Sequence, residues 1–151
     1  MPANKYFNKA GKRLPSFSTI DSYCKLGGIE GLMFWANKHG LEGRTLEDAR
    51  GEATTAGTIA HELASLAIKK QPILSPKEVA QKFNATDDMV TKGFNAYSMF
   101  VSWWDSSKIE LVESETQMVS EIYQVGGTPD AVGRLHGRNI LIDFKTCNQL
   151  S

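Results

Sequence analysis

Apolar and small residues recur at spacings of three and four between Thr45 and Ala67, and this period predicts an amphipathic helix. Thr45, with Asp48 three residues later, has the signature of a helix N-cap. The positions that share the predicted apolar face are Ala49, Ala53, Ala56, Ala60, Leu63 and Ala67. We therefore expect a long helix with one face turned to the core.

Three more helices are predicted, two of them by their capping signals and one by its apolar stripe. Ser18 and Asp21 form a capping pair, and the helix they open runs to a stop at His39-Gly40. A second helix starts at Ser75-Pro76. A third covers residues 86–105 and carries a wide apolar stripe, formed by Met89, Val90, Phe94, Tyr97, Phe100, Val101 and Trp104. Trp35 lies in the first of these helices, where we expect it in the core, with base stacking as the alternative.

Beyond residue 105 the pattern changes to extended runs, which predict strands over about 109–125, 130–135 and 139–144. The polar break at 136–139 predicts a tight turn between the last two strands. Helices followed by antiparallel hairpins predict an α+β (mixed α/β) fold. The chain has 151 residues and 41% apolar content, so we expect one domain over 1–151. Its parts are an irregular basic arm (1–15), a mainly helical region (16–105) and a β region (109–146).

Composition narrows the possible classes. Lys and Arg together number 17, and so do Asp and Glu, so the formal net charge is zero. This charge balance is not typical of a protein that covers DNA non-specifically, since phosphate binding depends on Lys and Arg. The basic residues Lys5, Lys9, Lys12 and Arg13 form a local cluster in the arm, which would either contact phosphates or be a solvated tail. We expect no membrane span and no signal peptide. Two cysteines, Cys24 and Cys147, are too few for a disulfide scaffold, so we expect a reduced cytoplasmic setting.

The candidate chemistry lies on the last predicted hairpin. Asp143 and Lys145 are two residues apart, so their side chains point to the same side of a strand. A hairpin of this length would return Asp143 to the neighbourhood of Asp130. Two carboxylates suit a divalent cation such as Mg²⁺, and an ammonium group can stabilise developing negative charge. The alternative for a bare Asp-x-Lys is a pair of solvated charges at the edge of a hairpin.

Two upstream residues are further candidates. His61 follows Gly57 by one helical turn, and glycine there would allow another backbone or a substrate to come close. Glu62 points about 100° away on the helix, which favours a solvated charge. Glu115, in the extended run before the hairpin, is a possible additional carboxylate, and an ordinary edge-strand position is the alternative.

The order Gly127-Thr128-Pro129-Asp130, strand, turn, strand, Asp143-Phe144-Lys145 resembles the core motif of the PD-(D/E)XK nuclease superfamily, in its RecB-like, phage-exonuclease branch. Gly57-x-x-x-His61, ahead of that motif, is similar to the same branch. The resemblance implies a restriction-endonuclease-like core with helices packed on a small mixed β-sheet. It also implies that Asp130, Asp143 and His61 bind the metal and that Asp130, Asp143 and Lys145 are catalytic.

What the resemblance implies about function is a DNA phosphodiesterase that uses Mg²⁺ or Mn²⁺. We expect an exonuclease in phage-type DNA recombination, repair or processing, in a bacterial cytoplasm or a phage-infected host cell. Arg134 and Arg138 are candidates for contacts with DNA phosphates. Relatives continue beyond the Asp-x-Lys motif with a helix and a strand, so we expect the C-terminal part of the core to be missing. A second copy or a partner subunit would complete the sheet, and the alternative function is a non-catalytic module that binds DNA or protein.

Overall fold

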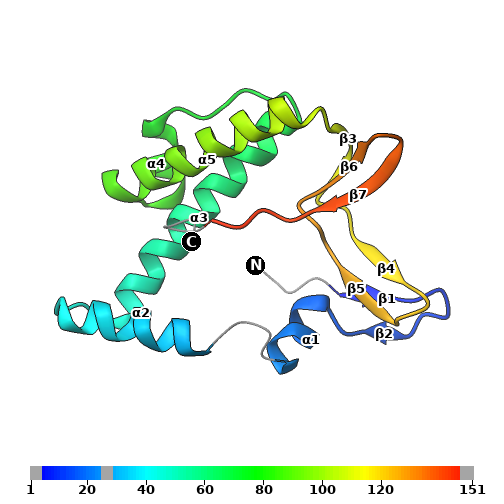
Figure 1. Cartoon of the computed structure of the whole chain (residues 1–151), viewed down its shortest axis with the longest axis horizontal. Helices are drawn as coiled ribbons and strands as arrows, with labels where there is room; N and C mark the ends of the chain where they lie inside the picture. The colour runs from blue at the N-terminus through cyan, green and yellow to red at the C-terminus, as the bar shows by residue number, and fades with distance from the viewer. Residues whose placement is uncertain (1–4, 25–28, 147–151) are drawn as a thin grey trace.

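The two longest helices, α3 (Leu46–Ile68) and α5 (Asp87–Ser107), pack side by side and organise the helical half of the molecule (Figure 1). The computed structural model describes residues 5–24 and 29–146. The capping prediction for α3 is confirmed. The Thr45 side chain accepts a hydrogen bond from the Asp48 N–H at 3.1 Å, and Thr86 caps α5 in the same way. Helix α4 (Pro76–Phe83) begins with a capping box between Ser75 and Glu78.

The helical core lies where α3, α4 and α5 meet. Its buried members are Ile59, Leu63, Val79 and Val90. Gly93 of α5 sits directly over Ile59, because a Cβ at Gly93 would lie only 2.5 Å from the Ile59 Cγ2 atom. This glycine therefore sets how closely the two long helices approach.

A three-stranded antiparallel sheet packs at one end of this helical layer (Figure 1). Its strands are β3 (Glu110–Ser114), β6 (Ala131–Leu135) and β7 (Arg138–Ile142), in the order β3-β6-β7. A second apolar cluster joins sheet to helices, with Ile68, Ala131 and Ile142 buried against Phe100 and Trp104. The apolar stripe predicted on α5 thus divides its residues between the two clusters.

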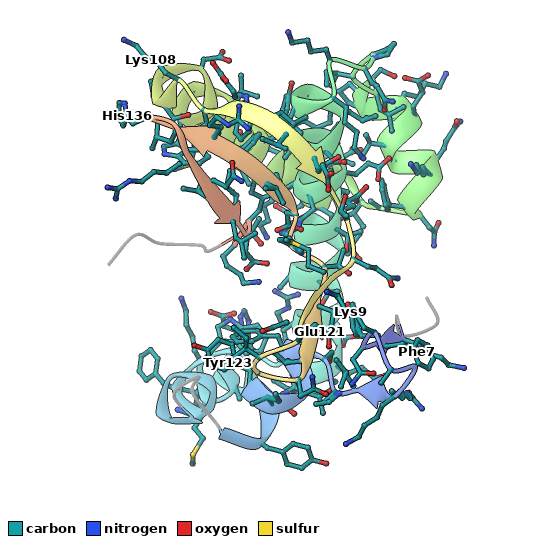
Figure 2. The ribbon with its side chains drawn as sticks, turned by 90° about the vertical axis from the view of Figure 1, so that its right-hand side faces the viewer. Phe7, Lys9, Lys108, Glu121, Tyr123 and His136 are labelled. Carbon is teal, nitrogen blue, oxygen red and sulfur yellow. The ribbon has the colours of Figure 1, made fainter. Side chains whose placement is uncertain are left out.

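The N-terminal arm, expected to be irregular, instead forms a short hairpin of β1 (Tyr6–Phe7) and β2 (Arg13–Leu14). It packs on a second hairpin made of β4 (Met118–Ser120) and β5 (Val125–Gly127). Gly126, just beyond the end of the predicted strand at 109–125, is a buried strand residue, and a Cβ there would stand 2.1 Å from the Tyr6 ring. Glycine in a strand often marks such a close approach. In this part of the molecule the Lys9 N–H donates to Glu121 across the two hairpins (Figure 2).

The first helical region also differs from its prediction. Helix α1 (Phe17–Cys24) is capped by Ser16, whose hydroxyl accepts from the Thr19 N–H at 3.1 Å, so the predicted Ser18 cap is wrong. Helix α2 (Ile29–Leu41) ends beyond His39-Gly40, since Gly43 has a φ of +73° and the Arg44 N–H bonds the His39 carbonyl. This is a helix stop at the next suitable glycine. The part of the predicted helix at 25–28 lies outside the described residues, as do Cys147 and the side chain of Cys24.

The α+β class is confirmed, with helices α1–α5 and small antiparallel sheets among the described residues. The expected single mixed sheet is instead three separate small sheets, and the parallel pairing that the structure describes is the isolated bridge between Ser16 and Gly126. The predicted strand over 109–125 is broken into β3, β4 and β5, because Glu115 and Gln124 adopt positive φ values of 55° and 52°. Every helix within the described residues is too short or too polar to cross a bilayer.

Candidate active site

The β6–β7 hairpin brings Asp130 and Asp143 to the same end of the sheet. Its turn residues His136 and Gly137 have φ values of 49° and 76°, as a type I′ turn requires. The register pairs Leu135 with Arg138 and, at the open end, Ala131 with Ile142. Asp130 and Asp143 are the next residues beyond that last pair. The sequence-based expectation that the hairpin returns Asp143 to Asp130 is therefore met by the register.

His61 reaches this end of the sheet from the middle of α3. Its Nδ1 atom lies 3.4 Å from Oδ1 of Asp130, which is an ion-pair distance longer than a normal hydrogen bond. The other Asp130 oxygen, Oδ2, accepts the backbone N–H of Phe144 at 2.5 Å. The Phe144 ring packs edge-on against the imidazole, with centroids 5.7 Å apart. In Figure 1 the red segment after β7 runs from the sheet toward α3, which is where these contacts form.

The charges at this site affect one another. The pKa of His61 is raised, mainly by its contact with Asp130, although partial burial acts in the opposite direction. Burial alone would raise the pKa of Asp130, but the contacts with His61 and the Phe144 N–H outweigh it and leave that pKa lowered. The charges of Lys145 and Asp143 also act on His61, with opposite signs. Four predicted site residues thus lie within electrostatic reach of one another.

Asp143 and Lys145 point to the same side of the chain, as their spacing predicts. The Lys145 Nζ atom lies 2.5 Å from Oδ2 of Asp143. Both side chains are open to solvent, with 57% of Asp143 and 81% of Lys145 exposed, whereas His61 and Asp130 are about two-thirds and three-quarters covered. The site therefore has a sheltered pair and an exposed pair.

The donor types suit a hard divalent cation. Carboxylate oxygens are what Mg²⁺ prefers, and an imidazole is a common ligand for transition ions. Ligating histidines usually have their second ring nitrogen held by a carboxylate, which is the relation of Asp130 to Nδ1 of His61. Within residues 5–24 and 29–146, however, no three His, Cys, Asp or Glu side chains already stand together as a complete metal-binding group. Asp143 is engaged with Lys145 instead.

Glu115 is close to the site only through its backbone. Its N–H donates to the Asp130 carbonyl at 3.2 Å, but its carboxylate forms a 2.7 Å ion pair with Lys69, at the C-terminal end of α3. The left-handed conformation at Glu115 ends β3 and gives the side chain this direction. The structure therefore does not bring Glu115 together with His61 and Asp130. Glu62 likewise faces away, in a 2.6 Å ion pair with Lys82.

Arg134 and Arg138 lie near the opposite end of the hairpin. Both are exposed and flank the turn at His136, which Figure 2 shows next to Lys108 at the edge of the molecule. At about 3.4 Å per strand residue, Arg134 is roughly 13 Å along β6 from Asp130. The charge pattern of the sequence predicts that Arg134 and Arg138 cluster with Lys145 near the site, and this prediction is wrong: both lie away from the carboxylates, as would any contact that they make with DNA.

Residues that the sequence did not single out also build the site. Phe144, between the two predicted catalytic residues, contacts both His61 and Asp130. The Tyr6 hydroxyl is 2.9 Å from Oγ1 of Thr128, so the N-terminal hairpin holds the segment that leads into Asp130. A Cβ at Gly57 would lie 3.1 Å from the Thr146 hydroxyl, so this glycine does allow the chain beyond Lys145 to pass close to α3.

Compared with known proteins, the chain matches no family model, no curated protein and no solved structure.

Proposed function

We propose that the protein is a divalent-metal-dependent deoxyribonuclease that hydrolyses DNA phosphodiester bonds, acting as an exonuclease in phage-type DNA recombination, repair or processing. The observation that carries the proposal is the meeting of His61, from α3, with Asp130 beside the Asp143–Lys145 pair. The order of these residues also resembles the PD-(D/E)XK nucleases of the RecB-like branch, and a restriction-endonuclease-like core is part of the same proposal.

Asp130, Asp143 and His61 are the residues that would hold Mg²⁺ or Mn²⁺, with the imidazole favouring Mn²⁺. A cation bound there would offset phosphate charge and lower the pKa of a water molecule. A histidine ligand must be neutral. Because Asp130 holds Nδ1 of His61, the Nε2 atom is the ring nitrogen that would coordinate the metal.

Lys145 supplies the ammonium group that positions the water or stabilises the negative charge that develops on the phosphate. Its ion pair with Asp143 is exposed, and such pairs contribute only about 0–1 kcal/mol. Lys145 can therefore exchange its partner Asp143 for a phosphate oxygen at little cost in free energy. The same exchange frees the Asp143 carboxylate.

The test is cleavage of end-labelled linear duplex DNA with Mg²⁺ or Mn²⁺, beside closed circular DNA and samples containing a chelator. We expect metal-dependent loss of the linear substrate and intact circles. Lys145→Ala should lower the rate by about 10²–10³-fold, the usual cost of removing one group that stabilises transition-state charge. Lys77→Ala, which removes an exposed lysine on α4, is the matched control and should cleave like the unmodified chain.

Three results would count against parts of the proposal. Loss of the circles as well would indicate an endonuclease. Equal rates for Lys145→Ala and Lys77→Ala would remove Lys145 from the mechanism. A folded chain that binds metal and DNA but forms no product would be the alternative, a non-catalytic binding module.

A further inference from the structure

A pocket of about 180 Å³ opens between α2, α3 and α5, and Thr146 also lines it. Its floor is formed by small residues on one face of α3: Ala49, Ala53, Ala56 and Gly57. The sequence pattern assigned these alanines to the core, but Ala53 is exposed and Ala56 is half-buried. Small side chains on an open helix face leave room for a ligand to lie against the backbone.

The pocket adjoins the candidate active site. Gly57 lines the pocket and is one helical turn before His61, and Thr146 follows Lys145 directly. Ala53 is two turns before His61, so at 1.5 Å per residue the middle of the pocket lies about 12 Å along α3 from the imidazole. A strand that keeps the stacked 3.4 Å rise per nucleotide of duplex DNA would cover that distance in about three to four nucleotides.

Two basic side chains line the pocket and lie within reach of a phosphate group bound there. Arg44 and Lys92 line it, together with one carboxylate, Glu52, which holds the Arg44 guanidinium at 2.5 Å. Lys92 is held by Asp88 from the preceding turn of α5. Each of these cations is thus held by one carboxylate in a partly exposed ion pair. Such pairs contribute little to stability, so a phosphate group can replace the two carboxylates at little cost in free energy.

The same pocket also presents an aromatic surface. Trp35 is half-buried, lies outside the two apolar clusters of the described fold, and packs edge-on against His39 with centroids 4.7 Å apart. Aromatic side chains beside cations are how proteins bind unpaired bases, by stacking the base and pairing its phosphate. A cavity of about 150 Å³ accommodates a benzene ring, so this volume suits one base and not a base pair.

We propose that this pocket binds one unpaired nucleotide of the DNA strand, about three to four nucleotides from the cleaved bond, with its base against Trp35 and its phosphate between Arg44 and Lys92. The inference rests on the proposed nuclease function and extends it, because it assigns a single-stranded segment of substrate to a defined place on α3. Arg44 and Lys92 would hold the strand at this place once its phosphate replaces their carboxylate partners.

The test measures binding without metal, in the presence of a chelator, so that it does not depend on cleavage. The probes are thymidine monophosphate, thymidine, inorganic phosphate, a short oligothymidylate and a blunt duplex, titrated into the full chain by calorimetry. The nucleotide and the oligothymidylate should bind more tightly than thymidine, phosphate or the duplex. Trp35 should show the perturbation in spectra of the tryptophan indole N–H groups.

Two variants with matched controls locate the site. Ala53→Leu fills the pocket and should weaken nucleotide binding at least about tenfold, or 1.4 kcal/mol. Thr54→Leu, on the neighbouring exposed position of α3, should not change it. Arg44→Gln with Lys92→Gln should weaken binding similarly, whereas Lys77→Gln with Lys82→Gln removes the same charge from α4 and should have no effect.

The proposal is overturned if Ala53→Leu binds the nucleotide as the unmodified chain does, if inorganic phosphate binds as well as the nucleotide, or if a folded chain binds no nucleotide. Failure of the nuclease proposal gives a different result. If only the nuclease proposal fails, the chain would still bind the nucleotide and Ala53→Leu would still weaken that binding, but no DNA product would form with Mg²⁺ or Mn²⁺.

Discussion

Asp130 uses both of its carboxylate oxygens within the protein, Oδ1 toward His61 and Oδ2 toward the Phe144 N–H. The first contact fixes which face of α3 meets the sheet, and the second fixes the path of the chain between Asp143 and Lys145. A carboxylate that accepts such contacts is stabilised in its ionised form. Asp130 is therefore both a candidate ligand and the residue that orients the other groups of the site.

The pKa of His61 tests this arrangement. Because the contact with Asp130 raises that pKa, Asp130→Asn should bring it back toward the ordinary value near 6.5. The measurement is a pH titration of the histidine ring signals by NMR in metal-free protein. Glu62→Gln is the control: it removes the carboxylate next in sequence, which faces Lys82, and should leave the His61 titration unchanged. An unchanged titration in Asp130→Asn would contradict the ion pair.

The ion pair between His61 and Asp130 also determines the pH range in which it stabilises the folded chain. The raised pKa of His61 means that its contribution is complete below 6.5 and is lost as pH rises through the folded-state value. The lowered pKa of Asp130 means that its contribution is present above 3.8 and is lost as pH falls. The pair should therefore stabilise the chain most between these values. Urea unfolding of the unmodified chain and Asp130→Asn at pH 5 and pH 8 should show the larger difference at pH 5, and equal differences would refute the window.

Among the elements, α3 has the most functions, because separate parts of its surface build the helical core, hold His61 and form the floor of the pocket. Its position depends on Gly93 of α5. Gly93→Ala should lower the free energy of unfolding by about 1–3 kcal/mol, since the added methyl group would overlap Ile59, a stiff β-branched side chain.

The control for that prediction lies on α3 itself. Gly51 is an exposed helical glycine with nothing within 4 Å of an added Cβ. Gly51→Ala should raise the free energy of unfolding by about 0.5–1 kcal/mol, because alanine favours the helix. Chemical denaturation midpoints of both variants make the measurement. Stabilisation by Gly93→Ala would mean that α3 and α5 do not approach as closely as described.

What the sequence predicts about these elements depends on how local the signal is. The caps at Thr45 and Ser75 are contacts within one helical turn, and their sequence signatures were sufficient. The breaks at Glu115 and Gln124 place residues other than glycine in the left-handed region, which no local pattern indicates. The same limit applies at the site: Asp143 and Lys145 are two residues apart and form a local ion pair, whereas the contacts of Phe144 depend on long-range packing.

At the scale of the whole molecule, the candidate site lies where separately built parts meet. α3 brings His61, the three-stranded sheet brings Asp143, and the N-terminal hairpin holds Thr128 just before Asp130. Composition and periodicity predicted an α+β chain, but they could not predict this junction, because it depends on which face of each element is turned to the others. The pocket was missed for the same reason, since its alanines look like core residues in the sequence.

A ligand bound at such a junction should stabilise the whole fold, because the unfolded chain does not bring His61 and Asp130 together. One site at a free metal concentration 100 times its Kd contributes about 2.7 kcal/mol. For a chain of 151 residues this corresponds to a rise in Tm of roughly 5–11 °C. We expect Mn²⁺ to produce such a rise in the unmodified chain and a chelator to reverse it.

Asp130→Asn should abolish the rise in Tm, since it removes a ligand and the group that orients His61. Glu115→Gln should retain it, because that carboxylate is turned to Lys69 and away from the junction. Equal shifts in the unmodified chain and Asp130→Asn would place the metal elsewhere. Loss of the shift in Glu115→Gln alone would mean that Glu115 leaves Lys69 to complete the site. Melting curves of these three chains therefore distinguish whether the junction of helix and hairpin, or only one of its parts, holds the ion.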